Sequence, residues 1–236
     1  MVTAATANYV TKTFEKITHS LNFLNDETDG GFFKLRQVND SALKKKSSHY
    51  KKINGQDIEE GFMSQIEGIV ADNDAKIRGD RVELLIFEEA GSNPNLRKSF
   101  VKGEALVNVG GNKLGLLLAG GTGGDSGKNL EGLHDMYYNP DTYDVLRYKH
   151  NYTEGNEVVE TAFFVPSYKA LDIEGYVDSR GVCITEKCIE HYNIERAKRS
   201  KSPKALIDYS AEYCFTAEEA FALEGENKFN KTYLSA

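Results

Sequence analysis

The chain is organised around the stretch Val82-Glu83-Leu84-Leu85-Ile86-Phe87-Glu88-Glu89-Ala90-Gly91, an apolar run that ends in two adjacent carboxylates and a glycine. A short continuous apolar run is typical of a strand buried on both faces, as in a parallel sheet. Glu88 and Glu89 would then lie at the carboxyl end of the strand, where ligands of open α/β folds bind. In the other interpretation, the two glutamates merely end the strand and face solvent.

Adjacent carboxylates at this position are typical of the acidic site in proteins that hydrolyse ATP. One carboxylate helps to hold Mg²⁺, and the next polarises the attacking water molecule. A second short apolar run, Leu114 to Ala119, predicts a neighbouring buried strand. The two runs together favour an α/β domain with a site at the carboxyl edge of its sheet.

A glycine-rich loop, Gly120 to Lys128, follows the second run. Glycines let backbone N–H groups approach a phosphate, but the Walker A pattern requires Ser or Thr after the lysine, and Asn129 stands there. We therefore expect a loop that carries Thr122 near the γ-phosphate, with glycines that permit movement. A plain strand-to-helix turn is the alternative.

Composition limits the class of protein. The chain has 236 residues, 40% of them hydrophobic, which suffices for one large domain or a domain with an appendage. A net charge of -7 argues against coating nucleic acid by bulk charge. The three cysteines lack the spacing of zinc ligands and predict free thiols in a reducing compartment. No apolar run approaches the roughly 18 residues of a membrane helix, and the first residues do not resemble a signal peptide, so a cytoplasmic protein is expected.

Periodicity and turn signals predict the remaining elements. The expected helices are Thr3 to Leu24, with no strand before it, a helix from about Leu96 to a stop at Gly110-Gly111, Leu130 to Tyr138, a largely helical Thr185 to Tyr213, and a short helix capped by Thr216 and Glu219. The expected strands, besides the two runs above, are Phe32 to Val38, Phe62 to Val70, Val145 to Lys149 and Thr161 to Val165.

Basic side chains concentrate in two places. The first group is Lys44, Lys45, Lys46, Lys51 and Lys52, and the second is a stripe that includes Arg196 and Arg199. Such residues are candidates for contacts with a phosphate backbone. The alternative is a solvated loop, and for the first group this is the preferred interpretation.

The order of these pieces over roughly residues 60 to 230 resembles the large terminase subunit of tailed bacteriophages, the motor that packages DNA into the capsid. The parts that carry the resemblance are Arg78-Gly79 ahead of the Leu84 to Gly91 stretch, Gly121-Thr122-Gly123-Gly124-Asp125, Met136-Tyr137-Tyr138-Asn139-Pro140, Phe163-Phe164-Val165-Pro166, and Phe215 to Phe221.

The resemblance implies a P-loop NTPase fold of the additional-strand, catalytic-glutamate type, incomplete at its N-terminus. Glu89 would be the catalytic base, and Glu88 would assist Mg²⁺ where the family usually has aspartate. Gly121, Thr122 and Gly123 would couple hydrolysis to movement, and Arg78 would be an arginine finger. Residues 1–165 would form a partial motor domain, and residues 166–236 a lid or linker.

This sequence lacks two parts of the family's large subunit, and their absence changes the function that is expected of it. The Walker A loop and the C-terminal nuclease domain both have no counterpart in this sequence, which therefore resembles an internal segment of a terminase. ATP and Mg²⁺ would serve the complete motor, with a further chain supplying Walker A. The implied partners are double-stranded DNA, the portal and procapsid, the small terminase subunit and neighbouring copies in a ring. The implied location is the host bacterial cytoplasm, transiently at the portal.

Two other interpretations remain open. The chain would act without catalysis as an assembly or DNA-contact module, or it would be a different, helicase-like ATPase with a diverged cradle in the Gly120 to Lys128 loop.

Overall fold

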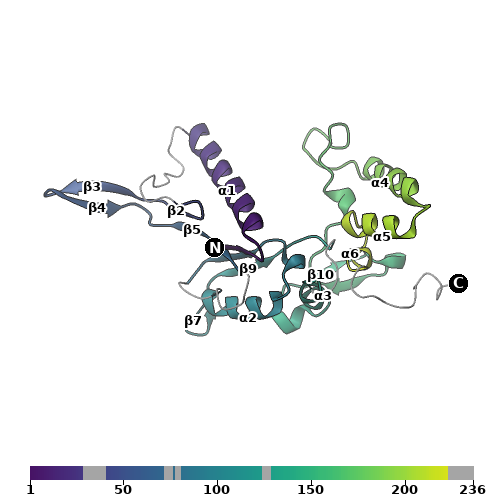
Figure 1. Cartoon of the computed structure of the whole chain (residues 1–236), viewed down its shortest axis with the longest axis horizontal. Coiled ribbons are helices and arrows are strands. Elements are labelled where there is room, and N and C mark those ends of the chain that lie inside the picture. Colours follow the sequence, from purple (N-terminus) through teal and green to yellow (C-terminus); the bar gives the residue numbers. More distant parts are fainter. Residues whose placement is uncertain (29–40, 72–76, 78–80, 124–128, 223–236) are drawn as a thin grey trace. The chain divides into compact units, whose positions relative to one another are not determined.

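The computed structural model describes residues 1–28, 41–71, 77, 81–123 and 129–222. The chain divides into two compact units (Figure 1). The first consists of Met1–Ala90 and Lys98–Gly120, and the second of Gly91–Arg97 and Gly121–Ala236. The boundary predicted at residue 165 divides a partial motor domain from a lid or linker. This division by function stays a prediction.

The first unit is built on a mixed five-stranded sheet with the order β2-β5-β1-β6-β9. Strands β5, β1, β6 and β9 run parallel, and β2 joins β5 antiparallel. The prediction of an α/β class and of two adjacent parallel strands is confirmed. The strands are β1 (Val2–Ala4), β2 (Lys44–Lys46), β5 (Gln65–Val70), β6 (Leu84–Phe87) and β9 (Leu116–Ala119).

Two helices, α1 (Ala7–Glu27) and α2 (Leu96–Val107), cover opposite faces of the sheet (Figure 1). A Cβ atom added to Gly68 would lie 2.8 Å from Val10 Cγ1, so α1 packs closely on the β1–β5 half of one face. A Cβ atom added to Gly103 would lie 2.8 Å from Leu85 Cδ2, so α2 packs on the β6–β9 half of the other face. These close contacts account for the absence of side chains at both glycines.

The start of the chain differs from the prediction. The expected helix from Thr3 begins only at Ala7, and its first residues instead form strand β1 in the middle of the sheet. The prediction that no strand precedes the helix was therefore wrong. Val2, Thr3 and Ala4 are all buried, so three residues with little local signal are fixed by pairing with β5 and β6.

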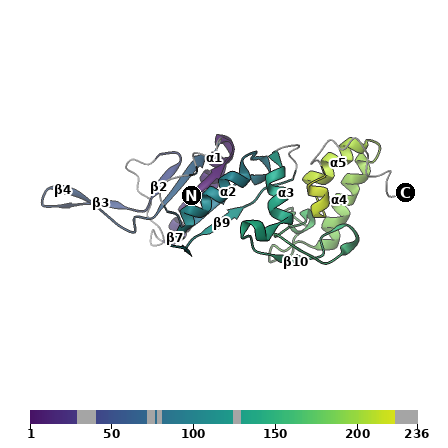
Figure 2. The ribbon, with the colours of Figure 1, turned by 90° about the horizontal axis from the view of Figure 1, so that it is seen from below.

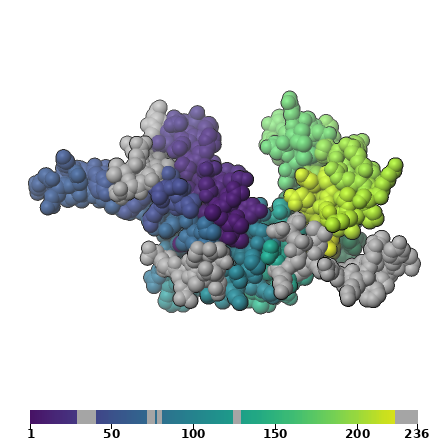
Figure 3. Space-filling view, viewed as in Figure 1, coloured from purple at the N-terminus to yellow at the C-terminus, as the bar shows by residue number. Residues whose placement is uncertain are grey.

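Two hairpins extend from the first unit. Strands β3 (His49–Ile53) and β4 (Gln56–Glu60) form a two-stranded ribbon that extends beyond the sheet (Figures 2 and 3). Asn54 and Gly55 turn it with φ of 52° and 83°, the geometry that Asn-Gly favours in tight hairpins. A smaller hairpin, β7 (Asn108–Val109) and β8 (Asn112–Lys113), follows α2, so Gly110-Gly111 turns a hairpin instead of ending the helix.

The second unit combines short helices with one antiparallel hairpin. Its helices are α3 (Glu131–Tyr138), α4 (Thr185–Arg199), α5 (Pro203–Glu212) and α6 (Ala217–Ala220), its strands are β10 (Tyr148–His150) and β11 (Val159–Thr161), and its 3-10 helices are η4 (Pro140–Tyr143), η5 (Glu154–Asn156) and η6 (Ser167–Lys169). A further 3-10 helix, η2, spans Ala90–Ser92. The predicted cap of the last helix is confirmed, since Thr216 Oγ1 accepts a hydrogen bond from the Glu219 N–H at 3.3 Å.

An aromatic cluster forms the centre of the second unit, and a buried histidine lies inside it. His150 Nδ1 accepts a hydrogen bond from the Tyr152 N–H at 3.1 Å, while Nε2 lies 3.0 Å from Tyr137 Oη and 2.8 Å from Thr161 Oγ1. Burial lowers the pKa of His150, against a smaller opposing effect of Glu218. Both ring nitrogens therefore have partners while the imidazole is neutral.

Other predictions concern the chain as a whole. Cys183, Cys188 and Cys214 are free thiols, as expected. No helix within the described ranges is long and apolar enough to cross a membrane. The strand predicted at Phe32 to Val38 lies outside the described residues.

Candidate functional site

The candidate site of the first unit lies at the carboxyl ends of β1 and β6, which are neighbours in the sheet. From β1 the chain passes over one face through α1 towards β5, and from β6 it passes over the other face through α2 to β9. Two adjacent parallel strands whose connections leave in opposite directions make a topological switch point. Open α/β sheets bind their ligands in the crevice at such a point.

Glu88 follows β6 at this switch point. Its N–H donates to Thr3 O at 2.7 Å, which continues the β1–β6 ladder by one residue. Its side chain is half-buried, and Oε1 accepts a hydrogen bond from Thr13 Oγ1 of α1 at 3.0 Å. The strand thus fixes the backbone of Glu88, and the helix fixes one of its carboxylate oxygens.

Glu89 has an unusual backbone conformation, with φ of 47°. This left-handed conformation costs a residue with a Cβ atom about 1–2 kcal/mol. The turn is held in place because the Ala90 N–H donates to Gly120 O at 2.9 Å and the Gly120 N–H donates to Phe87 O at 3.1 Å. A strained non-glycine residue that follows a central strand is consistent with a functional requirement for its side chain.

The junction between β1 and α1 borders the same edge of the sheet. Thr6 precedes the helix in an extended conformation and makes no side-chain cap. Free N–H groups in the first turn of a helix attract anions. This junction, Ala5-Thr6, contains neither the glycines nor the lysine of a phosphate loop.

The oxygen atoms at the edge suit a hard divalent cation. Glu88 offers a carboxylate and Thr13 a hydroxyl, and Mg²⁺ in phosphate-transfer sites is typically held by one or two carboxylates together with substrate phosphates. Among the described residues, no group of three or more His, Cys, Asp and Glu side chains is placed to hold a metal ion. A cation at this edge would need further ligands besides this carboxylate and this hydroxyl.

Gly121, Thr122 and Gly123, the predicted coupling residues, belong to the second unit. A Cβ atom at Gly91 would lie 2.4 Å from Thr122 O, and one at Gly123 would lie 2.0 Å from Ala220 O. Both glycines are thus required for close backbone packing. The coupling role of Thr122 stays a prediction, and residues 124–128 of the loop lie outside the described residues.

Arg78, the predicted arginine finger, also lies outside the described residues. Its role stays a prediction.

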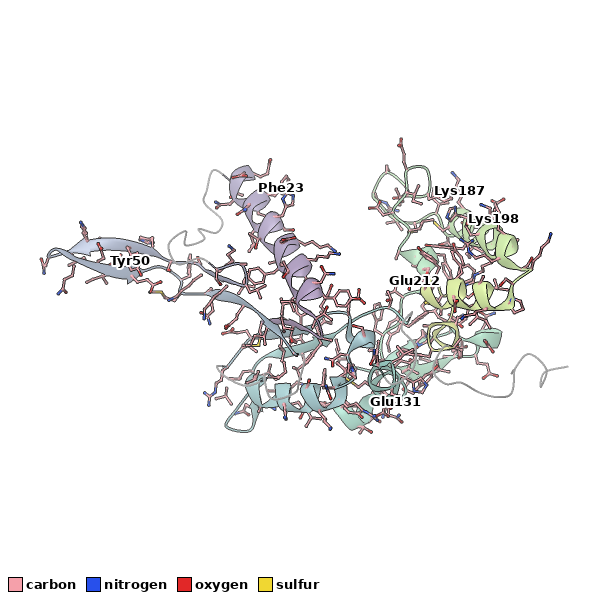
Figure 4. All side chains as sticks on the ribbon, in the orientation of Figure 1. Phe23, Tyr50, Glu131, Lys187, Lys198 and Glu212 are labelled. Carbon is pink, nitrogen blue, oxygen red and sulfur yellow. The ribbon has the colours of Figure 1, made fainter. Side chains whose placement is uncertain are left out.

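The lysines of the first basic group lie on strands and not in a loop, and Lys44, Lys51 and Lys52 are exposed to solvent, as that interpretation expected. Lys44, Lys45 and Lys46 form β2, and Lys51 and Lys52 lie on the β3–β4 ribbon together with Tyr50 (Figure 4). Acidic residues of β4 and β5 offset part of this charge through the ion pairs Lys44–Glu67 (3.7 Å), Lys46–Glu59 (3.1 Å) and Lys51–Glu60 (3.7 Å). The DNA contact stays a prediction for these lysines.

The two arginines of the second basic group have partners within their own unit. The Arg196 side chain is only 17% exposed, and its guanidinium lies 2.7 Å from Glu219 Oε1 and 3.9 Å from the centre of the Phe215 ring. Arg199 pairs with Glu195 at 2.9 Å and stacks on Tyr209. A DNA phosphate would have to displace Glu219 to reach Arg196, which makes a structural role the simpler interpretation of that residue.

Sequence reasoning missed β1 and Thr13 as parts of the site. Thr13 was counted within a helix, and nothing in its immediate sequence indicates a carboxylate partner 75 residues away. The available signal was Val2-Thr3 followed by Thr6, a β-branched pair and then a residue that often starts helices.

Three comparisons with known proteins found no match: none with a family model, none with a curated protein and none with a solved structure.

Proposed function

We propose that this chain contributes the acidic half of an ATP-hydrolysis site in a DNA-packaging motor similar to the large terminase subunit. The observation that carries the proposal is the switch point between β1 and β6, with Glu88 and Glu89 at its carboxyl edge. The parallel strands and the helices on both faces of the sheet also suit a P-loop NTPase fold.

In this proposal each residue of the edge has one task. Glu88, oriented by Thr13, would hold Mg²⁺ directly or through water, and the ion would neutralise charge on the phosphates. Glu89 would orient and deprotonate the attacking water. Thr122 and its neighbouring glycines would couple hydrolysis to movement, and Arg78 would reach a nucleotide bound by a neighbouring copy.

The phosphate-binding half of the site would come from a segment with the pattern G-x-x-x-x-G-K-[ST] that these 236 residues do not contain, because the Ala5-Thr6 junction does not supply it. The purified chain should therefore show no robust ATP turnover on its own. ATP turnover should appear when the chain is mixed with a polypeptide that carries that loop.

The test is Mg²⁺-dependent ATP hydrolysis by that mixture. Glu89→Gln should lower the rate by roughly 10²–10⁴-fold, the usual contribution of a general base. Glu83→Gln is the matched control, since Glu83 precedes the same strand at its opposite end and is exposed. Equal rates for the two variants would contradict the role of Glu89, and robust turnover by the unmixed chain would contradict the division of the site.

A second candidate is a non-catalytic module for assembly or DNA contact. The β3–β4 ribbon favours it, because both of its strands are largely exposed and β3 carries Tyr50, Lys51 and Lys52. DNA binding that weakens steeply with salt, needs no nucleotide and is lost in Lys51→Gln/Lys52→Gln would favour this candidate over the first.

A further inference from the structure

Two cysteines of the second unit lie together at the start of α4. The N-cap of this helix is Ile184, so Cys183 precedes the cap and Cys188 is the fourth residue of the helix. Side chains at these two positions commonly pack against each other and fix the direction in which the chain enters a helix. Helical side chains also lean towards the N-terminus of their helix, which directs the Cys188 thiol towards Cys183.

The hydrogen bonds of the two thiols agree with this placement. Cys183 Sγ donates to Leu171 O at 3.3 Å, and Cys188 Sγ donates to Tyr176 O at 3.6 Å. Both acceptors belong to the segment that leads into α4. Burial, and after it the neighbouring Cys183 thiol, raises the pKa of Cys188. The two sulfur atoms are therefore neighbours, and both are fixed against the same segment.

The two thiols differ in their access to solvent. Cys183 is half-buried, whereas Cys188 is completely buried. A small oxidant in solution therefore reaches Cys183 first. A reactive cysteine that is open to solvent, with a second cysteine beside it to resolve the oxidised sulfur, is the usual arrangement of reversible thiol oxidation.

We propose that Cys183 and Cys188 form an oxidation site that closes a reversible internal disulfide in the presence of a peroxide. Hydrogen peroxide oxidises the Cys183 thiol to a sulfenic acid and leaves one water molecule. The sulfur of Cys188 then attacks the Cys183 sulfur, the S–S bond forms, and the hydroxyl group leaves with the Cys188 proton as a second water. Two electrons and two hydrogen atoms thus pass from the thiols to one peroxide, and a small dithiol reverses the reaction.

Metal binding is a weaker use of the same pair. Among the residues that the structure describes, no group of three or more His, Cys, Asp and Glu side chains is placed to hold a metal ion. The third cysteine has a different neighbour, since the Cys214 side chain hydrogen-bonds with Ser167. Disulfide chemistry between Cys183 and Cys188 requires no further ligand.

The disulfide would change the junction between α4 and the segment before it. Both S–H donors are lost, so Leu171 O and Tyr176 O lose the bonds that the thiols make. Tyr176 O still accepts a hydrogen bond from the Ile184 N–H at 2.8 Å, and Gly175 O still accepts one from Lys187 Nζ at 3.2 Å. The change is therefore local, and the inference does not rest on the proposed function.

The test treats the folded full chain with hydrogen peroxide, alkylates the remaining thiols and digests the chain with trypsin. Trypsin cleaves after Arg180, Lys187 and Arg196, which places Cys183 in peptide 181–187 and Cys188 in peptide 188–196. Mass spectrometry should find these two peptides linked, with Cys214 alkylated. Treatment with dithiothreitol before alkylation should separate them.

Three variants distinguish the pair from its single members. Cys183→Ala should abolish the disulfide, and Cys214→Ala is the matched control, because it also leaves two thiols and should give the linked peptides as the unchanged chain does. Cys188→Ala should let Cys183 proceed to the sulfinic acid, which dithiothreitol does not reduce, because the resolving thiol is gone. Circular dichroism establishes that each variant folds.

Three results would overturn the proposal. The first is a sulfinic acid at Cys183 of the unchanged chain without linked peptides. The second is a disulfide to Cys214, or between two chains, in an amount equal to the internal one. The third is linkage that forms as fast in the urea-unfolded chain as in the folded chain, since the folded structure would then contribute nothing to the reaction.

Discussion

Replacement of Gly123 by alanine tests whether the glycines of the loop serve packing or movement. An ideal Cβ atom at Gly123 would lie 2.0 Å from Ala220 O and 2.6 Å from the Ala220 carbonyl carbon. These are backbone atoms, so no rotamer change can relieve the overlap, and α6 would have to shift. Overpacking of this kind costs about 1–3 kcal/mol in the free energy of unfolding.

Gly120→Ala is the control in the same glycine run. A Cβ atom at Gly120 would have no neighbour within 4 Å, and its φ lies outside the left-handed region. The substitution should leave stability unchanged or raise it by about 0.4–1 kcal/mol, because alanine reduces the conformational entropy of the unfolded chain. Alanine at Gly123 and alanine at Gly120 should therefore change the free energy of unfolding in opposite directions.

The assay is urea unfolding followed by tyrosine fluorescence and by far-UV circular dichroism. The chain has no tryptophan, and of its 13 tyrosines only Tyr9 and Tyr50 lie in the first unit, so tyrosine fluorescence reports mainly on the second. Gly123→Ala should move the tyrosine transition to lower urea, and the thermal midpoint should fall by roughly 2–4 °C for each kcal/mol lost. If Gly123→Ala unfolds at the same urea concentration as the unchanged chain, or if Gly120→Ala loses as much stability as Gly123→Ala, the argument from packing fails. Free movement of the loop then becomes the better explanation for its glycines.

Two further predictions concern the second unit. Burial lowers the pKa of His150, so below pH 6.5, the ordinary pKa of histidine, the unfolded chain binds more protons than the folded chain, and the free energy of unfolding should be highest above pH 6.5 and fall as the pH decreases towards the lowered pKa. In urea titrations at several pH values, His150→Gln should remove this pH dependence, and substitution of the exposed His49 by Gln should leave it unchanged. A pH dependence that survives His150→Gln would contradict its assignment to His150. Arg196→Met should lower the free energy of unfolding by about 1–3 kcal/mol, because it leaves the Glu219 carboxylate partly buried without its cation. Arg180→Met should lower it by at most about 1 kcal/mol, because Arg180 is 81% exposed. Equal losses would show that the Arg196–Glu219 pair contributes no more than a surface pair.

The parts of the fold that the sequence predicts well are those with a strong local pattern. The apolar runs at β6 and β9 and the helix between them carry their own signal. The predicted burial of both strands on both faces was wrong, because Leu84, Leu116 and Leu118 are 39%, 54% and 51% exposed. The acidic pair at the end of β6 is likewise read directly from the chain. Its position at a switch point follows only from the order of the strands.

The parts that could not be predicted depend on distant pairing. Val2, Thr3 and Ala4 continue a helical pattern equally well, and only contact with β5 and β6 makes them a strand. The β3–β4 ribbon is a different case, because Asn54-Gly55 is a recognised hairpin signal that the lysines before it obscured. The hydrogen bond from Thr13 to Glu88 joins residues that no local rule relates.

The central position of β1 has a consequence for how the first unit folds. The Met1 amino group donates to Leu84 O at 2.6 Å across a separation of 83 residues, and β1 is the strand that joins β5 to β6. During synthesis, the residues of β1 must therefore wait for partners that emerge much later, and closing so long a loop adds entropy cost before the β1–β6 contact forms. Until β6 is made, the sheet can consist only of β2, β5 and β1, and α1 has only this part of the sheet to cover. The first unit should consequently become fully protease-resistant only late in synthesis, after β6 and β9 have been made.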